Sequence, residues 1–219
     1  MQASEAEIQN YLSKLSAFEY KGAWRIFDEV YRIEVLKNFM LILMKHNWDE
    51  IRVRLVSQEL PEVPYEILTA LLQTIGSINS DIFECDKLKV YQMCVCDLFS
   101  CSSEYILDEF KQALEKLQDC LIYRKFISKS ITLEDIIEGL AVQRTMNFRA
   151  TVKYLPVLKL NFSLEERMQV LFGVKEKWTE RELKVYLEDV ALMSMPQLLM
   201  KHMKKVIEGN SVLYMGKLN

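Results

Sequence analysis

The sequence predicts a mainly α-helical protein with short β-ribbons, in which one structural unit recurs along the chain. Helix-start signals come in groups, and each group is followed by a short β-prone stretch with a turn residue. In residues 159–219 the order is complete, with three helices and then a ribbon. This is the order of a winged helix-turn-helix unit, whose third helix can enter a DNA groove. We therefore expect a tandem array of winged-helix units.

The same order predicts four units. Residues 1–27 form a partial first unit, consisting of its last helix and wing, and complete units follow at 28–86, 87–158 and 159–219. The units share little letter-by-letter identity, so the repeat is one of structure rather than of sequence.

The last unit carries the clearest signals. Ser163 and Thr179 are each followed three residues later by Glu, which is the pattern of a capping box at a helix start. Ser194 opens a third helix with Pro in its first turn, where the missing N–H has no intrahelical partner. Gly209 is expected to end that helix as a left-handed C-cap. We also expect Trp178, just before the second helix, to pack on it as a staple.

The predicted third helix has a basic outer face. Helical spacing turns Met195, Leu199, Met203 and Val206 inward, which leaves the lysines on the other side. Lysines at this position are expected to contact DNA phosphates without sequence preference. A solvated helix face, with lysines complementing the helix dipole, explains the pattern equally well. The candidate DNA-binding residues are Lys201, His202, Lys204, Lys205 and Lys217.

Near the N-terminus, residues 17–27 change to the alternation of a β-hairpin. We expect a three-residue loop at 21–23, in which Gly22 takes the positive φ that such loops need. That loop length would place Trp24 on an apolar face and bury it. The other members of this face are Phe18, Tyr20 and Ile26.

Composition limits the functions that the chain can have. A net charge of −3 at pH 7 argues against nucleic-acid binding over the whole surface and leaves a local basic patch as the alternative. The longest apolar run, residues 39–44, is far shorter than the ~20 residues that span a bilayer. The five cysteines and the lack of an N-terminal apolar signal favour an intracellular, reduced protein.

No motif in the sequence predicts catalysis. The two histidines, His46 and His202, have no nucleophile motif beside them, and neither of the usual glycine-rich phosphate loops occurs. Cys94, Cys96 and Cys101 suggest zinc, but positions i and i+2 of a helix diverge, so we expect buried thiols instead. The sequence therefore predicts a protein that is not an enzyme and needs no cofactor or metal.

Three stretches carry a family resemblance, and they are Gln2-Ala3-Ser4-Glu5-Ala6-Glu7-Ile8, Gly22-Ala23-Trp24-Arg25-Ile26 and Glu176-Lys177-Trp178-Thr179-Glu180. They resemble the C-terminal half of the sister chromatid cohesion subunit of the alternative, replication factor C-like clamp loader, and the resemblance spans nearly the whole chain. The resemblance implies a nuclear protein with DNA-binding winged helices. The partners that it implies are the other clamp-loader subunits, DNA polymerase epsilon and, indirectly, the sliding clamp.

Two functional hypotheses follow from the sequence. The first is a non-catalytic DNA-binding accessory arm that helps to place a clamp loader at replication forks. The second is a scaffold of winged-helix units that binds other proteins and does not contact DNA, as the acidic overall balance allows.

Overall fold

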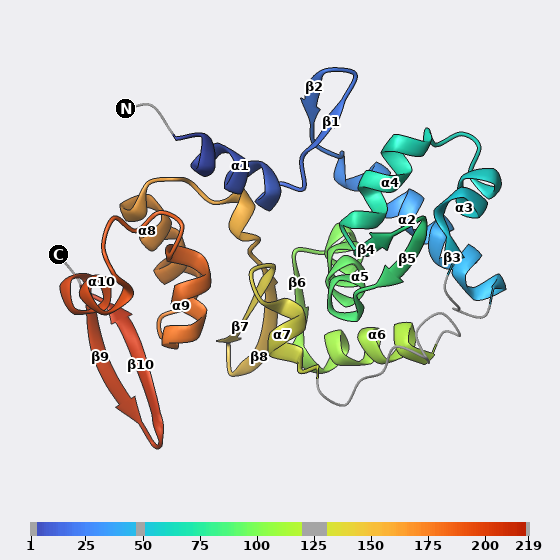
Figure 1. Ribbon diagram of the computed structural model, residues 1–219. Helices are drawn as coiled ribbons and strands as arrows, with labels where there is room; N and C mark the ends of the chain where they lie inside the picture. The colour runs from blue at the N-terminus through green and yellow to red at the C-terminus, as the bar shows by residue number, and fades with distance from the viewer. Residues whose placement is uncertain (1–3, 47–50, 120–130, 218–219) are drawn as a thin grey trace. The chain divides into compact units, whose positions relative to one another are not determined.

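The computed structural model describes residues 4–46, 51–119 and 131–217 (Figure 1). The chain divides into two compact units. One comprises Met1–Leu98 and Gln112–Thr132, and the other comprises Phe99–Lys111 and Leu133–Asn219. In the described ranges, no helix is both long enough and apolar enough to cross a membrane.

The first unit has a helical core with small antiparallel sheets. Helix α2 begins at Asp28, whose Oδ1 accepts a hydrogen bond from the Tyr31 amide at 3.0 Å. Its buried Phe39 packs edge-on against Phe83, with ring centroids 5.1 Å apart. The elements in chain order are α1 (Glu5–Lys14), β1 (Phe18–Tyr20), β2 (Ala23–Arg25), α2 (Glu29–Lys45), β3 (Ile51–Arg52), α3 (Val53–Glu59), α4 (Tyr65–Gln73), β4 (Gly76–Asn79), β5 (Ile82–Cys85) and α5 (Lys87–Cys101), which ends in the second unit.

The second unit has its own core, built mainly from α8, α9 and α10 and from the residues that lead into them. Its elements in chain order are β6 (Glu104–Ile106), α6 (Leu107–Asp119), which ends in the first unit, α7 (Leu133–Ile137), β7 (Ala141–Met146), β8 (Arg149–Tyr154), a 3-10 turn (Val157–Lys159), α8 (Leu164–Val174), α9 (Glu180–Leu187), α10 (Met195–His202), β9 (Met203–Glu208) and β10 (Ser211–Gly216).

Within the described residues, the order helix, strand, helix, helix, strand, strand occurs twice, and a third group follows the same order except for its first strand. The sheets are β3-β5-β4 and β6-β8-β7, so the first strand of each group pairs with the last. In the third group a bridge from Trp178 to Tyr214 of β10 takes the place of the first strand, and β10 pairs with β9. A mainly helical chain with short ribbons is thus confirmed. The tandem winged-helix array and the four-unit division stay predictions.

The sequence patterns did not indicate the short strands β3 and β6, which lie between the first two helices of their groups. Strand β6 covers Glu104–Ile106, and helix α6 begins only at Leu107. Strands of two or three residues are too short to show an alternating pattern, so periodicity alone cannot separate them from the adjoining helix.

The expected burial of Trp24 is wrong, because the hairpin loop is one residue shorter than predicted. Tyr20 pairs with Ala23, which leaves the two-residue turn Lys21-Gly22 with φ of +52° and +73°. Trp24 therefore lies opposite Glu19 and on the other face from Phe18. Its side chain is 50% exposed.

We expect the two described tryptophans to differ sharply in their contribution to stability. Trp178 is fully buried, so Trp178→Ala should lower the free energy of unfolding by about 3–5 kcal/mol. Trp24→Ala, the matched control, should cost about 1 kcal/mol or less because half of that side chain is already in water. Urea unfolding followed by circular dichroism measures both, and equal costs would contradict this assignment.

Candidate nucleic-acid interface

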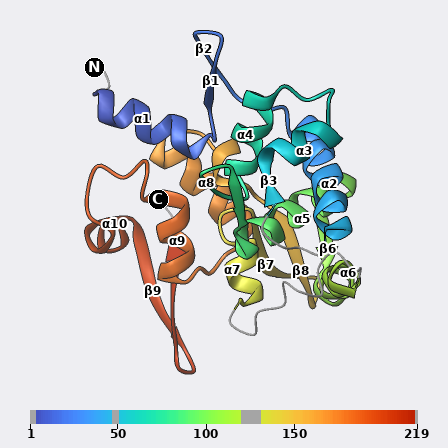
Figure 2. The ribbon, with the colours of Figure 1, turned by 45° about the vertical axis from the view of Figure 1, so that its right-hand side comes forward.

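The predicted third helix of the last unit is a helix followed by a strand. Helix α10 ends at His202, and β9 begins at Met203, so Lys204 and Lys205 are strand residues. Gly209, with φ +58°, lies in the turn of the β9–β10 hairpin and does not cap a helix (Figure 2). The residues of β9 form a strand rather than a helix because every one of them pairs with a residue of β10. Val206 and Ile207 are also β-branched residues, which favour a strand.

The expected common face of the lysines is therefore wrong. Successive residues of a strand point to opposite faces, so Lys204 and Lys205 diverge. Lys205 lies across from Tyr214, whereas Lys204 lies across from Met215. Both lysines are exposed, as is Lys201 in the last turn of α10. The three residues flank the junction of α10 and β9 and do not form one helical stripe.

Lys217 and His202 hold the end of α10 against the ribbon. The Lys217 Nζ donates to the carbonyl oxygens of Met200 at 2.8 Å and Lys201 at 3.0 Å, which have no helical partner at a C-terminus. The Lys217 amide donates to the His202 carbonyl at 3.1 Å, and the His202 side chain is half-buried. A DNA role for these two residues stays a prediction, while their structural role is visible.

Ion pairing distinguishes the lysines at this junction from their neighbours. Lys175 contacts Glu182, and Lys177 contacts Glu208 of β9, each at 2.5 Å. The hydrogen bond to Glu208 raises the pKa of Lys177. In contrast, no ion pair with a described residue involves Lys201, Lys204 or Lys205. These three ammonium groups are available for an external anion.

The ribbon that carries two of these lysines is fixed to the helices through Trp178. The Trp178 amide donates to the Tyr214 carbonyl at 3.0 Å, and the Tyr214 amide donates back at 2.8 Å. The indole Nε1 donates to the Lys175 carbonyl at 2.7 Å, and the ring packs edge-on against Tyr186. Thr179 then starts α9 with the predicted capping box, which is confirmed: the Glu182 amide donates to Thr179 Oγ1 at 3.2 Å, and the Thr179 amide donates to the Glu182 carboxylate at 2.9 Å.

A buried arginine of α8 joins that helix to the end of α9. This residue was not singled out from the sequence. Arg167 of α8 is 1% exposed, and its Nε donates to the Asn161 carbonyl at 2.8 Å. One Nη donates to the Tyr186 carbonyl at 2.8 Å and to Asp189 Oδ1 at 2.6 Å, at the end of α9. Its spacing from Leu164 and Leu171 puts it on the inward face of α8, which was the available signal.

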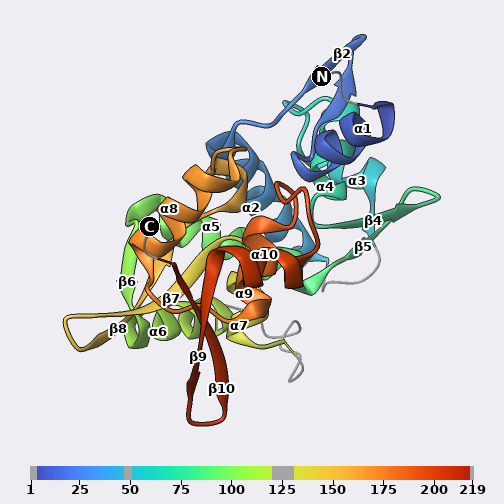
Figure 3. The same ribbon diagram turned by 90° about the vertical axis from the view of Figure 1, so that its left-hand side faces the viewer.

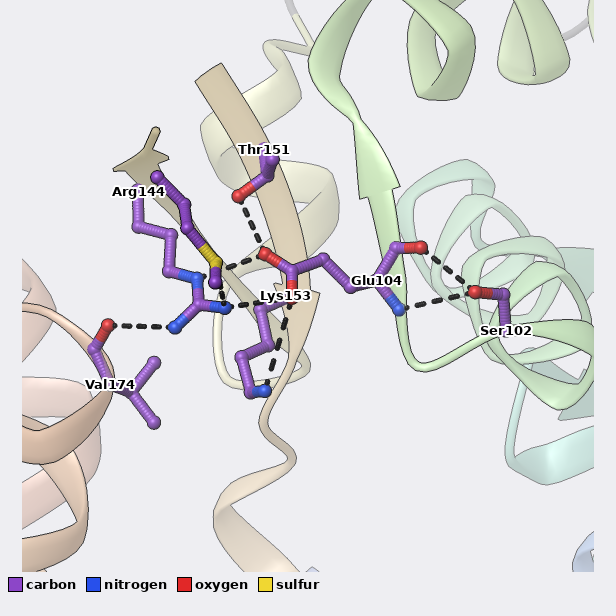
Figure 4. A network of polar contacts seen from close by, with 7 residues as sticks. Ser102, Glu104, Arg144, Thr151, Lys153 and Val174 are labelled. Atoms are coloured by element: carbon purple, nitrogen blue, oxygen red, sulfur yellow. Dashed lines mark hydrogen bonds and ion pairs between the residues drawn. The ribbon is translucent and has the colours of Figure 1, made fainter. Parts of the chain in front are cut away.

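A second polar network in this unit ties a sheet to the end of α8 (Figure 4). Glu104 of β6 accepts two hydrogen bonds from Arg144 of β7, at 2.9 and 2.7 Å, and one from Thr151 of β8 at 2.7 Å. Arg144 also donates to the carbonyl of Val174, the last residue of α8, at 3.1 Å. The Arg144 hydrogen bond lowers the pKa of Glu104. Lys153 of β8 adds a second cation, with its Nζ 4.0 Å from the same carboxylate. These contacts join β6, β7 and β8 to one another and to α8, which is a structural role.

A shallow groove of about 500 Å³ lies beside Lys205. Its lining is largely apolar and includes Pro196 and Met200 of α10 and Tyr214 of β10, with Glu180 as an acidic member. Burial, followed by the effect of Glu180, raises the pKa of Tyr214. The groove offers an apolar surface next to the basic junction.

The described residues contain no group of three or more His, Cys, Asp or Glu side chains that could hold a metal ion. Of the cysteines weighed as zinc ligands, Cys94 and Cys96 are buried in α5 and Cys101 is exposed.

The fold and the basic junction together define a mainly helical protein of repeated helix-and-ribbon units with an exposed cationic edge. Residues 1–187 match the family described as Sister chromatid cohesion protein Dcc1, and the chain belongs to this family. This confirms the family resemblance carried by the three stretches.

Among curated relatives, the sister chromatid cohesion protein DCC1 of Mus musculus is 27% identical over 198 residues, which cover 87% of this chain and 47% of the relative. The Homo sapiens protein of the same name is 27% identical over 198 residues, which cover 87% and 48%. The Danio rerio protein is 24% identical over 225 residues, which cover 98% and 55%. The chain spans about half the length of the curated relatives that it matches.

The Glu104 network predicts a pH dependence of stability. A carboxylate whose folded pKa is lowered stabilises the fold above its unfolded pKa, and this contribution is lost as pH falls through the folded pKa. Glu104→Gln should therefore be less stable than the parent at about pH 6, and the difference should shrink towards about pH 3. Thermal unfolding of both proteins across this range checks the prediction. A difference that stays constant with pH would contradict it.

Proposed function

We propose that this chain is a non-catalytic part of a clamp-loader assembly that acts in sister chromatid cohesion in the nucleus, and that it contacts the DNA backbone. Family membership supports the cohesion role, since the curated relatives are named as sister chromatid cohesion proteins. The clamp-loader subunits and DNA polymerase epsilon as partners, and the sliding clamp as an indirect one, rest on the resemblance of the sequence to the loader subunit.

The recurring order of elements supports a winged-helix interpretation of each group. In all three groups of described elements, the segment between the first two helices pairs with the last strand. In the last group, α10 then corresponds to the third helix and β9–β10 to the wing, the two elements with which such proteins meet a duplex.

The observation that carries the DNA proposal is the set of three lysines at the α10–β9 junction that have no acidic partner among the described residues. A phosphate attracts any accessible ammonium group, so the lysines need not lie on one helix face to bind a backbone. Base reading is not proposed. On α10 the side-chain oxygen of the exposed Gln197 accepts a hydrogen bond from the Ser194 amide at 3.3 Å, which prevents the two-point contact through which Gln reads an adenine.

A protein-binding scaffold is the second candidate function. The groove beside Lys205 favours it, since Met200 is 76% exposed and Pro196 and Tyr214 line the same depression. An apolar contact there would bind protein and would depend only weakly on salt.

Replacing Lys201, Lys204 and Lys205 together by Ala should weaken duplex binding to the same degree on every sequence. Removing one phosphate interaction should flatten the slope of log K against log salt by about 0.9. Fluorescence anisotropy with two unrelated duplexes at several salt concentrations measures both effects. The control replaces Lys111, Lys116 and Lys184, which are exposed lysines of α6 and α9, and changes the net charge equally.

Both triple variants should fold, because exposed substitutions usually change stability by no more than ~0.5 kcal/mol. If the junction variant binds duplex as tightly as the control variant at the same salt, the DNA role of the junction is wrong. The apolar groove would then be the better-supported binding surface.

A further inference from the structure

The tip of the β7–β8 hairpin presents an aromatic side chain to solvent. Asn147 and Phe148 form the two-residue turn between the strands, with φ of +49° and +62° (Figure 3). The Phe148 side chain is fully exposed, with a relative accessibility of 103%. It buries no surface within the described residues of this chain.

Folding does not explain a phenylalanine at this position. Two-residue turns with positive φ at both positions favour Asn-Gly, because a side chain at the second position is strained there. The two other hairpin turns of this geometry have Gly22 and Asp81 at the second position, which are residues that tolerate the left-handed region. Phe148 thus combines backbone strain with an absence of burial, and no contact with the described residues gives it an advantage.

The residues next to the turn indicate the chemistry of a ligand for the exposed ring. Met146 and Arg149 pair directly across the strands at the base of the tip, and both are exposed. No ion pair with a described residue involves Arg149. The Arg144 guanidinium contacts the Met146 sulfur at 3.2 Å and is itself neutralised by Glu104. The tip therefore offers an aromatic ring, a flanking thioether and one uncompensated cation.

We propose that Phe148 stacks on an unpaired base of single-stranded DNA, with Arg149 on the neighbouring phosphate. Stacking on aromatic rings beside a cation is how proteins hold single strands without sequence preference. Inside a duplex both faces of every base are covered by its neighbours, and only the outer faces of the two terminal pairs are open, so the ring can stack along a strand only where the bases are unpaired. This inference rests on the proposed DNA contact and adds single-stranded DNA as the ligand of a second surface.

The test compares variants at Phe148 in the whole chain, by anisotropy with a labelled oligothymidylate and with a blunt duplex. Loss of one base stack, worth about 1–3 kcal/mol, should make Phe148→Gly bind the oligothymidylate about 5- to 150-fold more weakly than the parent. Duplex affinity should change by less than about twofold, since no base is unpaired there. Phe148→Gly should also melt at the same or a higher temperature, because it removes strain and no buried surface.

Two further substitutions separate stacking from a general apolar contact. Phe148→Trp should retain binding, and its added tryptophan fluorescence should be quenched by the oligothymidylate. Phe148→Leu should bind as weakly as Phe148→Gly. Leu192→Gly is the matched control, because Leu192 is 100% exposed in the same unit and should leave binding unchanged.

Parental affinity of Phe148→Gly for the oligothymidylate would overturn the proposal, and a protein pocket would become the better partner for this ring. Parental affinity of Phe148→Leu would also overturn it, because an apolar contact would then suffice. The lysine variant at the α10–β9 junction separates this inference from the proposed function. If that variant keeps full duplex affinity while Phe148→Gly loses the single strand, the junction assignment fails and the stacking assignment stands.

Discussion

The pair of backbone hydrogen bonds between Trp178 and Tyr214 fixes the C-terminal part of this structure. They join the segment before α9 to the last strand, and the fully buried indole excludes water from them. A buried backbone hydrogen bond is costly to leave unmade, so α9, β10 and the paired strand β9 are positioned together. The location of Lys204 and Lys205 follows from this constraint, because residues opposite Met215 and Tyr214 cannot belong to a helix.

Much of the fold could be predicted because helix starts have strong local signals. Thr179 caps α9 as the sequence predicts, since its side-chain oxygen and the carboxylate of Glu182 together satisfy backbone amides that have no partner within the helix. What could not be predicted depends on pairing between distant residues. The residues of β9 fit a helical stripe as well as a strand, and only the partner strand decides between them. The predicted burial of Trp24 was wrong for a similar reason, since a hairpin loop shorter by one residue moves its side chain to the opposite face.

The candidate site was predicted in composition but not in arrangement. The exposure of Lys201, Lys204 and Lys205 is as the sequence indicates, whereas the capping role of Lys217 depends on where the ribbon meets the end of α10. Phe148 was missed because an aromatic residue in a β-prone stretch looks like a core residue. Its signal is visible only in the backbone, as a positive φ at a position that favours glycine.

Because the chain has a net charge of −3, the proposed binding to DNA must come from a local cationic edge. The most direct test is the salt dependence of duplex binding by the unmodified chain. If three lysines contact phosphates, log K should fall against log salt with a slope of about −2 to −3. A slope near zero, or no binding at low salt, would contradict the account.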